Sequence, residues 1–118
     1  MSYFTFDNKK IYYEENGSGT PLLFLHGNTA SSKMFTDFSK RYTDSYKVIL
    51  IDFLGHGRSE RLSEFPADLW FYEAQQAIAF LRHKHYDKVN IIGCSGGAIV
   101  ALNVALEASE CVDKVIAD

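Results

Sequence analysis

Short apolar runs alternate along the chain with longer stretches in which apolar residues recur at helical spacing. The runs at 22–25, 48–51 and 89–92 are apolar at almost every position, which is typical of strands buried on both faces of a parallel sheet. Residues 3–6 and 11–15 form two shorter strand-like runs separated by turn residues, and they predict an antiparallel hairpin.

Three stretches predict helices, because apolar side chains in each recur at the spacing of one helix face. The first begins among the cap-forming residues 29–32, the second soon after Pro66, and the third directly after residue 95. Their predicted faces are Phe35, Phe38 and Tyr42; Phe71, Ala74, Ile78 and Leu81; and Ala98, Ile99, Ala101, Leu102, Ala105 and Leu106. With a last strand at 112–117, this alternation predicts an α/β fold: a mostly parallel sheet with an N-terminal antiparallel hairpin and helices on both faces.

A chain of 118 residues, 47% hydrophobic and 23% charged, has enough apolar material for one core and predicts a single domain over residues 1–118. The formal net charge of -3, with no long run of one sign, argues against nucleic acid or an anionic membrane as a partner. Residues 89–106 carry no charge and approach the length of a membrane span. Polar residues interrupt them and the period changes midway, so we expect a buried strand and its helix instead.

Cysteine usage and the N-terminus bear on the cellular compartment. Cys94 and Cys111 are too few for a disulfide framework, and residues 1–7 lack the basic and apolar segments of a secretory signal. We therefore expect a cytoplasmic protein. We expect no cofactor and no metal site; a nucleotide site at 55–57 would need the full G-x-G-x-x-G spacing, which these residues lack.

The pentapeptide Gly93-Cys94-Ser95-Gly96-Gly97 fits G-x-S-x-G and stands where a strand pattern changes to a helical one. In this context hydrolases present a nucleophilic serine on a sharp strand-to-helix turn, the elbow. The elbow crowds the backbone two residues before and two after its apex, and glycine at both positions leaves the space that a Cβ would fill. We therefore predict Ser95 as a nucleophile at the positive end of the following helix.

Polar motifs follow all three central strands of the predicted sheet. His-Gly-Asn at 26–28 follows the first, residues 52–59 follow the second, and the elbow follows the third. Ligands of open parallel sheets bind at the carboxyl ends of the strands, so these motifs are expected to share one site.

Together, the His-Gly-Asn motif, the D-x-x-G-x-G-x-S stretch at 52–59 and the elbow resemble the α/β-hydrolase superfamily, in particular the N-terminal half of its esterase-like and lipase-like members. The resemblance covers the whole chain. It implies that the backbone N–H groups of Asn28 and Gly96 form the oxyanion hole for a tetrahedral intermediate, and that 52–59 is mainly a structural loop. It also implies that Cys94, where many relatives have histidine, points away from Ser95.

The same resemblance implies that the triad acid and histidine follow the nucleophile, beyond residue 118. Asp118 is a candidate for the acid, because some relatives take it from the end of this strand; the alternative is a frayed terminal carboxylate. His26 is expected to support the oxyanion loop, with general base as the alternative, and His56 to be structural, because its strand lies two positions from the elbow strand. His83 and His85 are expected on the surface.

The implied activity is that of a serine hydrolase for a carboxylic ester or related small acyl substrate. Residues 1–118 would be the front half of a larger enzyme and nearly inactive alone, because a serine without a base is a weak nucleophile. The alternative is a non-catalytic fragment or binding module that keeps the scaffold. The aromatic cluster 70–72 either lines a substrate cavity or packs its helix, and the unpaired edge of the last strand predicts self-association or pairing with the missing half.

Overall fold

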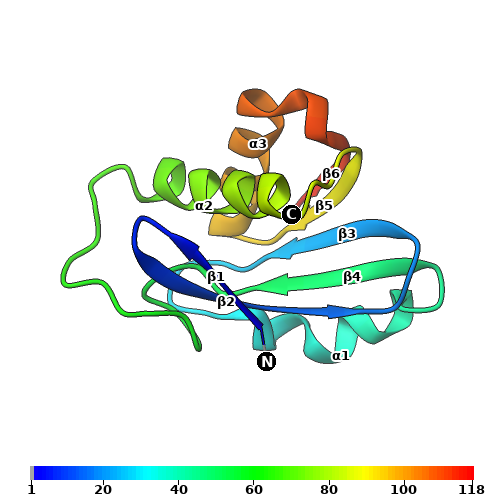
Figure 1. The fold of residues 1–118 in the computed structure, drawn as a ribbon, viewed down its shortest axis with the longest axis horizontal. Coiled ribbons are helices and arrows are strands. Elements are labelled where there is room, and N and C mark those ends of the chain that lie inside the picture. The colour runs from blue at the N-terminus through cyan, green and yellow to red at the C-terminus, as the bar shows by residue number, and fades with distance from the viewer. Residues whose placement is uncertain (1) are drawn as a thin grey trace.

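Six strands form one mixed sheet in the computed structural model, which describes residues 2–118 (Figure 1). The strands are β1 (Ser2–Phe6), β2 (Lys9–Asn16), β3 (Thr20–Leu25), β4 (Tyr46–Ile51), β5 (Val89–Gly93) and β6 (Val112–Ala117). Their order across the sheet is β1-β2-β4-β3-β5-β6, antiparallel from β1 to β4 and parallel from β4 to β6. The predicted fold class is confirmed.

Strands β1 and β2 form the predicted hairpin. Asp7 and Asn8 make its turn with φ of 52° and 61°. Two-residue hairpin turns of type I′ require this left-handed region at both positions, and Asp and Asn tolerate it better than most residues. The turn is shorter than predicted, because Lys9 and Lys10 already pair with β1.

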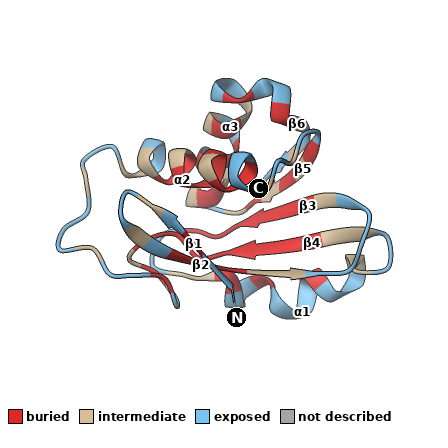
Figure 2. Ribbon diagram, viewed as in Figure 1, coloured by how far each residue is buried: buried red, intermediate tan, exposed pale blue. Residues whose placement is uncertain are grey.

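Strands β3 and β4 lie in the middle of the sheet and are buried at nearly every position of their second halves (Figure 2). Strand β3 pairs with both β4 and β5, so the segments that follow these strands emerge side by side at one end of the sheet. One face carries Leu23, Leu25, Ile49 and Ile51, and the other carries Leu22, Phe24, Val48 and Leu50. The apolar runs are continuous because each face has its own core.

Two long helices cover one face of the sheet, and a short helical segment covers part of the other (Figure 1). The long helices are α2 (Leu69–His83) and α3 (Gly96–Glu107). The short segment consists of η1 (Ser32–Phe35), α1 (Thr36–Ser39) and η2 (Lys40–Tyr42), and a further 3₁₀ turn, η3 (Ser109–Cys111), precedes β6. The prediction of helices on both faces is confirmed.

The first predicted helix is therefore broken into 3₁₀ and α turns. Phe35, Phe38 and Tyr42 still share a face, since all three rings pack around Phe24 with centroids 5.0, 6.2 and 6.2 Å away. The Ser39 hydroxyl donates to the Thr36 carbonyl at 3.2 Å, a bond that competes with continuous helix. The spacing of the aromatic residues predicted the correct face of this segment, but not its division into 3₁₀ and α turns.

Of the residues predicted for the buried face of α3, only Ala101 is buried. The buried residues of this helix are Gly97, Val100, Ala101 and Val104, whereas Ile99, Leu102 and Leu106 are 42%, 52% and 80% exposed. The helix is apolar on all sides, so periodicity could not select the face, and the close approach of Gly97 to β3 decides it. In α2 the predicted face is confirmed for Ala74, Ile78 and Leu81 but wrong for Phe71, which is 44% exposed.

The sheet ends at β6, which pairs with β5 on one side and has no strand on the other among residues 2–118. Ile116 on this edge strand is 60% exposed. Within the described part of the chain, none of the helices combines the length and apolar character needed to cross a membrane.

Candidate active site

Ser95 occupies the sharp turn between β5 and α3. Its backbone has φ of 60° and ψ of -122°, a strained conformation for a residue with a side chain, and its surface is exposed. A Cβ on Gly97 would overlap the Leu25 carbonyl, and one on Gly93 would overlap the Gly97 carbonyl. The two glycines therefore allow the approach of backbone segments that creates this turn.

Three backbone hydrogen bonds fix the elbow to the neighbouring strands. The Cys94 N–H donates to the Leu25 carbonyl at 3.2 Å, and the Ser95 N–H donates to the Asp118 carbonyl at 2.9 Å. The Asp118 N–H in turn donates to Gly93 at 2.9 Å. Backbone from β3 and from the end of β6 thus holds Ser95 on both sides.

Asn28 and Gly96 lie together beside Ser95. A Cβ built on Gly96 would stand 3.4 Å from the Asn28 backbone nitrogen, and one built on Gly27 would stand 3.2 Å from Ser95 Cβ and 3.6 Å from the Gly96 nitrogen. Neither the Asn28 nor the Gly96 N–H donates to an acceptor among residues 2–118. Two unused backbone donors therefore adjoin the exposed serine. Trp70 reaches the same place, since its Nε1 is 3.0 Å from that Gly96 Cβ position.

His26 is buried beneath the loop that carries Asn28. Its Nδ1–H donates to the Gly27 carbonyl at 2.7 Å, and its Nε2 accepts from the Phe53 N–H at 3.0 Å. One donor and one acceptor define a single neutral tautomer. Burial lowers the pKa of His26 to about 4. The ring fastens the loop after β3 to the loop after β4, and both of its nitrogens are engaged by the backbone.

His56 is also buried, and its ring centroid lies 5.0 Å from that of His26. Its Nε2 is 3.1 Å from Asn28 Oδ1, and its Nδ1 is 3.1 Å from the Leu54 carbonyl. Glu73 of α2 approaches Nδ1 to 4.0 Å through an Oε2 that has no hydrogen-bond partner among residues 2–118. Burial raises the pKa of Glu73 to about 7.

Asp52 has a hydrogen-bonding place inside the loop that follows β4. Its carboxylate accepts from the Ser32 N–H at 2.6 Å and from the Arg58 N–H at 3.1 Å. The Ser59 hydroxyl donates to the Asp52 carbonyl and accepts from the Tyr12 N–H at 2.7 Å. These bonds satisfy the buried Asp52 carboxylate with backbone N–H groups. The contacts therefore agree with the prediction that residues 52–59 are mainly a structural loop.

The remaining sequence candidates are dispersed. His83 and His85 are exposed, and the His83 ring stacks on Phe4 at 5.8 Å. Asp118 touches the elbow through its backbone, and its side chain is exposed. Cys94 is partly buried against the apolar cluster of Leu22 and Phe24. Among residues 2–118 no side chain hydrogen-bonds the Ser95 hydroxyl, so the described residues hold no general base in contact with it.

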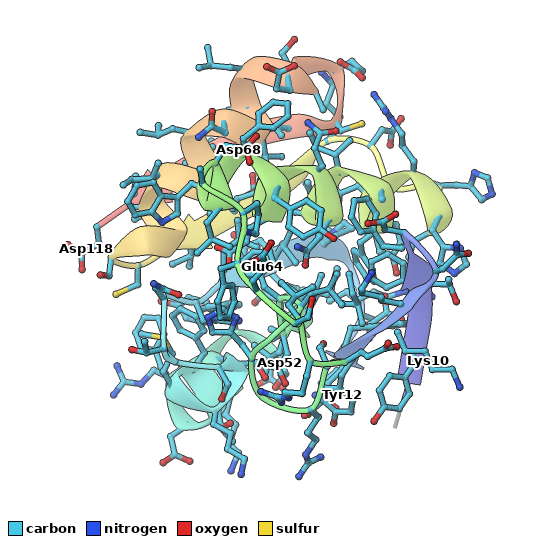
Figure 3. All side chains as sticks on the ribbon, turned by 90° about the vertical axis from the view of Figure 1, so that its left-hand side faces the viewer. Lys10, Tyr12, Asp52, Glu64, Asp68 and Asp118 are labelled. Atoms are coloured by element: carbon cyan, nitrogen blue, oxygen red, sulfur yellow. The ribbon has the colours of Figure 1, made fainter. Side chains whose placement is uncertain are left out.

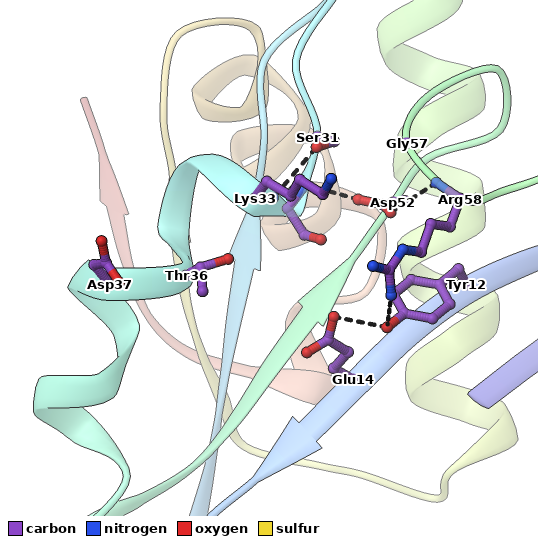
Figure 4. Close-up of a pocket in the computed structure, with 10 residues that line it drawn as sticks. Tyr12, Glu14, Ser31, Lys33, Thr36, Asp37, Asp52, Gly57 and Arg58 are labelled. Carbon is purple, nitrogen blue, oxygen red and sulfur yellow. Dashed lines mark hydrogen bonds between the residues drawn. The ribbon is translucent and has the colours of Figure 1, made fainter. Parts of the chain in front are cut away.

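One hollow of the described chain is not lined by Ser95. It encloses about 700 Å³ and is lined by Tyr12, Glu14, Ser31, Ser32, Lys33, Thr36, Asp37, Asp52, Gly57 and Arg58 (Figure 4). Arg58 donates to the Tyr12 hydroxyl, which donates to Glu14, so these three lining side chains satisfy one another. The connection from Asp52 past Glu64 to Asp68 crosses the carboxyl ends of the strands (Figure 3).

Sequence reasoning did not single out Glu73 or Gln76. Both are buried on α2, and Gln76 Oε1 accepts from the Leu54 N–H at 2.9 Å. The sequence offered one clue to both residues, which is their place in the helix. Glu73 is next to Ala74 and Gln76 is next to Ala77, and both alanines lie on the apolar side of this amphipathic helix. Polar residues at such positions must meet polar groups of another segment.

A family profile described as "alpha/beta hydrolase fold" matches residues 20–118. The chain belongs to the α/β-hydrolase fold family. Haloalkane dehalogenase 2 of Mycobacterium tuberculosis is 29% identical over 114 residues, which are 97% of this chain and 40% of the dehalogenase. A putative esterase/lipase of Haemophilus influenzae is 27% identical over 110 residues, 92% of this chain and 37% of that protein.

Among solved structures of this family, the chain is similar to "Est816 as an N-Acyl homoserine lactone degrading enzyme". The TM-score is 0.85 at 27% identity, over 94% of this chain and 42% of Est816. This α/β-hydrolase chain thus spans about 40% of the length of the relatives it matches. The comparison places β1 to β6 and the elbow in the N-terminal portion of the fold.

Proposed function

We propose that residues 1–118 supply the nucleophile and the oxyanion hole of a serine hydrolase for carboxylic esters or related small acyl compounds. The main support for this proposal is that Ser95 is exposed at φ of 60° and lies beside the unused backbone N–H groups of Asn28 and Gly96. Two such donors stabilise the negative oxygen that forms when a hydroxyl adds to a carbonyl.

The proposed reaction begins with attack of Ser95 Oγ on the carbonyl carbon. The carbonyl π electrons move to oxygen, which the Asn28 and Gly96 N–H groups then hold. When this intermediate collapses, the ester C–O bond breaks and the alcohol leaves with the proton that the base took from Ser95. Water then hydrolyses the acyl-serine ester to the acid and frees Ser95. The base that takes the Ser95 proton is proposed to lie outside residues 1–118.

A hydroxyl nucleophile favours acyl substrates over alkyl halides, although one relative is named as a dehalogenase. Displacement of a halide by Ser95 would leave an ether, which has no carbonyl for water to attack. Turnover would stop after one cycle. An acyl-serine ester keeps its carbonyl and can be hydrolysed, so the serine hydroxyl supports ester chemistry.

The test uses the complete protein that contains residues 1–118, with p-nitrophenyl butyrate as substrate. Ser95→Ala should lower kcat by about 10⁴-fold or more, because it removes the nucleophile. A fluorophosphonate should label the wild type once, with the mass increase on the peptide that contains Ser95. Ser109→Ala is the control, since this exposed serine lies at η3.

Full esterase activity in Ser95→Ala, with unchanged Ser109→Ala, would overturn the proposal. A wild-type protein that neither hydrolyses acyl esters nor takes the label would favour the alternative, a binding module on the same scaffold. Residues 1–118 alone are proposed to label far more slowly than the complete protein, because the oxyanion hole without a base retains only part of the rate acceleration.

A further inference from the structure

A side-chain bond joins the two loops that follow β3 and β4. His56, which is 4% exposed, places its Nε2 3.1 Å from Oδ1 of the exposed Asn28. Asn28 is the residue whose backbone N–H is proposed to hold the oxyanion. The bond therefore connects a buried ring to an exposed member of the proposed site.

The backbone next to Asn28 is strained and needs a restraint. Thr29 has φ of 63°, an uncommon value for a β-branched side chain. The Ala30 N–H to Gly27 bond at 3.2 Å and the His26 ring hold the Gly27 carbonyl at the start of this turn, whereas the Asn28 side chain is held by His56. Strained turns of this kind persist only where the surroundings hold them.

The imidazole of His56 is itself held in one orientation. Leu54 O lies 3.1 Å from its Nδ1, and Glu73 Oε2 lies 4.0 Å from the same atom. The rings of His26 and Phe65 flank it with centroids 5.0 and 5.7 Å away. A ring fixed on three sides can transmit its position to Asn28.

We propose that His56 is a positioning residue for the acyl-transfer reaction: its bond to the Asn28 side chain holds the strained turn at Asn28 and Thr29, and so keeps the Asn28 N–H beside that of Gly96. The clamp works with either orientation of the amide, because Nε2–H can donate to Oδ1 or an unprotonated Nε2 can accept from Nδ2. This inference rests on the proposed function.

The experiment measures kcat and KM of the complete protein with p-nitrophenyl butyrate for His56→Leu, Asn28→Ala and the double variant. Each single change should lower kcat about 10- to 100-fold with KM within about two-fold, less than the roughly 10²- to 10³-fold loss of a whole oxyanion donor. Asn28→Ala keeps the backbone N–H of residue 28, so a lower kcat in this variant would result from a displaced N–H and not from a missing one. The double variant should be no slower than the slower single variant, because both break one bond.

Two further variants separate positioning from general stability. His56→Gln, whose amide can still bond Asn28, should regain kcat to within a few-fold of the wild type. His83→Leu, at an exposed histidine outside the site, should leave kcat unchanged. Unchanged kcat in Asn28→Ala, or multiplied losses in the double variant, would overturn the clamp while leaving the serine mechanism intact.

A second readout does not depend on turnover. Deuterium exchange of the peptide that covers residues 26–31 should accelerate to the same degree in His56→Leu and Asn28→Ala, because both release the turn. Equal exchange in wild type and Asn28→Ala would overturn the clamp even if the protein has no esterase activity. Loss of activity in Ser95→Ala, by contrast, reports only on the proposed function.

Discussion

His26 and His56 begin the same dipeptide, His-Gly, and follow neighbouring parallel strands, yet the structure gives them different surroundings. Both rings are buried and only 5.0 Å apart. His26 faces one backbone donor, Phe53 N–H, and one acceptor, Gly27 O, whereas His56 faces the Leu54 carbonyl, the exposed side-chain amide of Asn28 and a nearby carboxyl. Because both rings are buried, burial does not distinguish them. Their hydrogen-bond partners do: His26 joins backbone groups of two loops, whereas His56 can restrain a side chain.

The largest expected difference between the two histidines is in the free energy of unfolding when each is replaced by leucine. His26→Leu leaves the Phe53 N–H buried without an acceptor, and we expect it to lower the free energy of unfolding by about 3 to 4 kcal/mol. His56→Leu should cost less, about 1 to 2 kcal/mol, because its partner Asn28 is exposed and can turn to water. Urea unfolding followed by circular dichroism measures both, with His83→Leu as the control. Equal losses at positions 26 and 56 would break the comparison.

Acid should affect the His26 side of the comparison. The folded pKa of His26 is lowered to about 4 from 6.5, so the unfolded chain binds the proton first as pH falls. The corresponding stability is fully present above pH 6.5 and is lost between pH 6.5 and 4, about 3 kcal/mol in all. The free energy of unfolding of the wild type minus that of His26→Gln should show this slope across pH 7, 6, 5 and 4, because both proteins keep Glu73 and its contribution cancels in the difference. Parallel curves would contradict the assignment.

Glu73, beside His56, should give a slope of opposite sign and similar size. The folded pKa of Glu73 is raised to about 7 from 4.5, so the native state holds a proton that the unfolded chain releases. The contribution of Glu73 to stability should therefore be lost as pH rises from 4.5 to 7, about 3 kcal/mol in all. Glu73→Gln should match the wild type at pH 4.5 and be more stable than it at pH 8. A Glu73→Gln protein that is less stable at pH 8 would show that the ionised carboxylate stabilises the fold.

Much of the fold could be predicted from the sequence because the central strands are apolar at almost every position. The runs that became β3, β4 and β5 had this property, and the Asp7-Asn8 turn explains the hairpin. The face of α3 could not be predicted, because this helix is apolar all round and carries Ile99, Leu102 and Leu106 outside. Periodicity selects a face only where polar residues mark the other one.

The elbow of the candidate site could be predicted because only glycine satisfies its steric requirement at two positions. Gly93 and Gly97 are required by the backbone approach at the elbow, so Ser95 could be identified from spacing alone. Glu73 could not, because its relation to His56 joins two residues 17 positions apart on different elements. No pattern along the chain records that distance.

By itself the sequence determined the order of strands and helices, the hairpin and the serine elbow, because these depend on spacing between near neighbours. The tertiary structure alone decided which side of α3 meets the sheet, and that Asn28, His56 and Glu73 form one line of contacts. The physical reason is that such contacts depend on how β3, β4 and α2 are placed in space. Local propensity specifies an element, whereas packing specifies its neighbours.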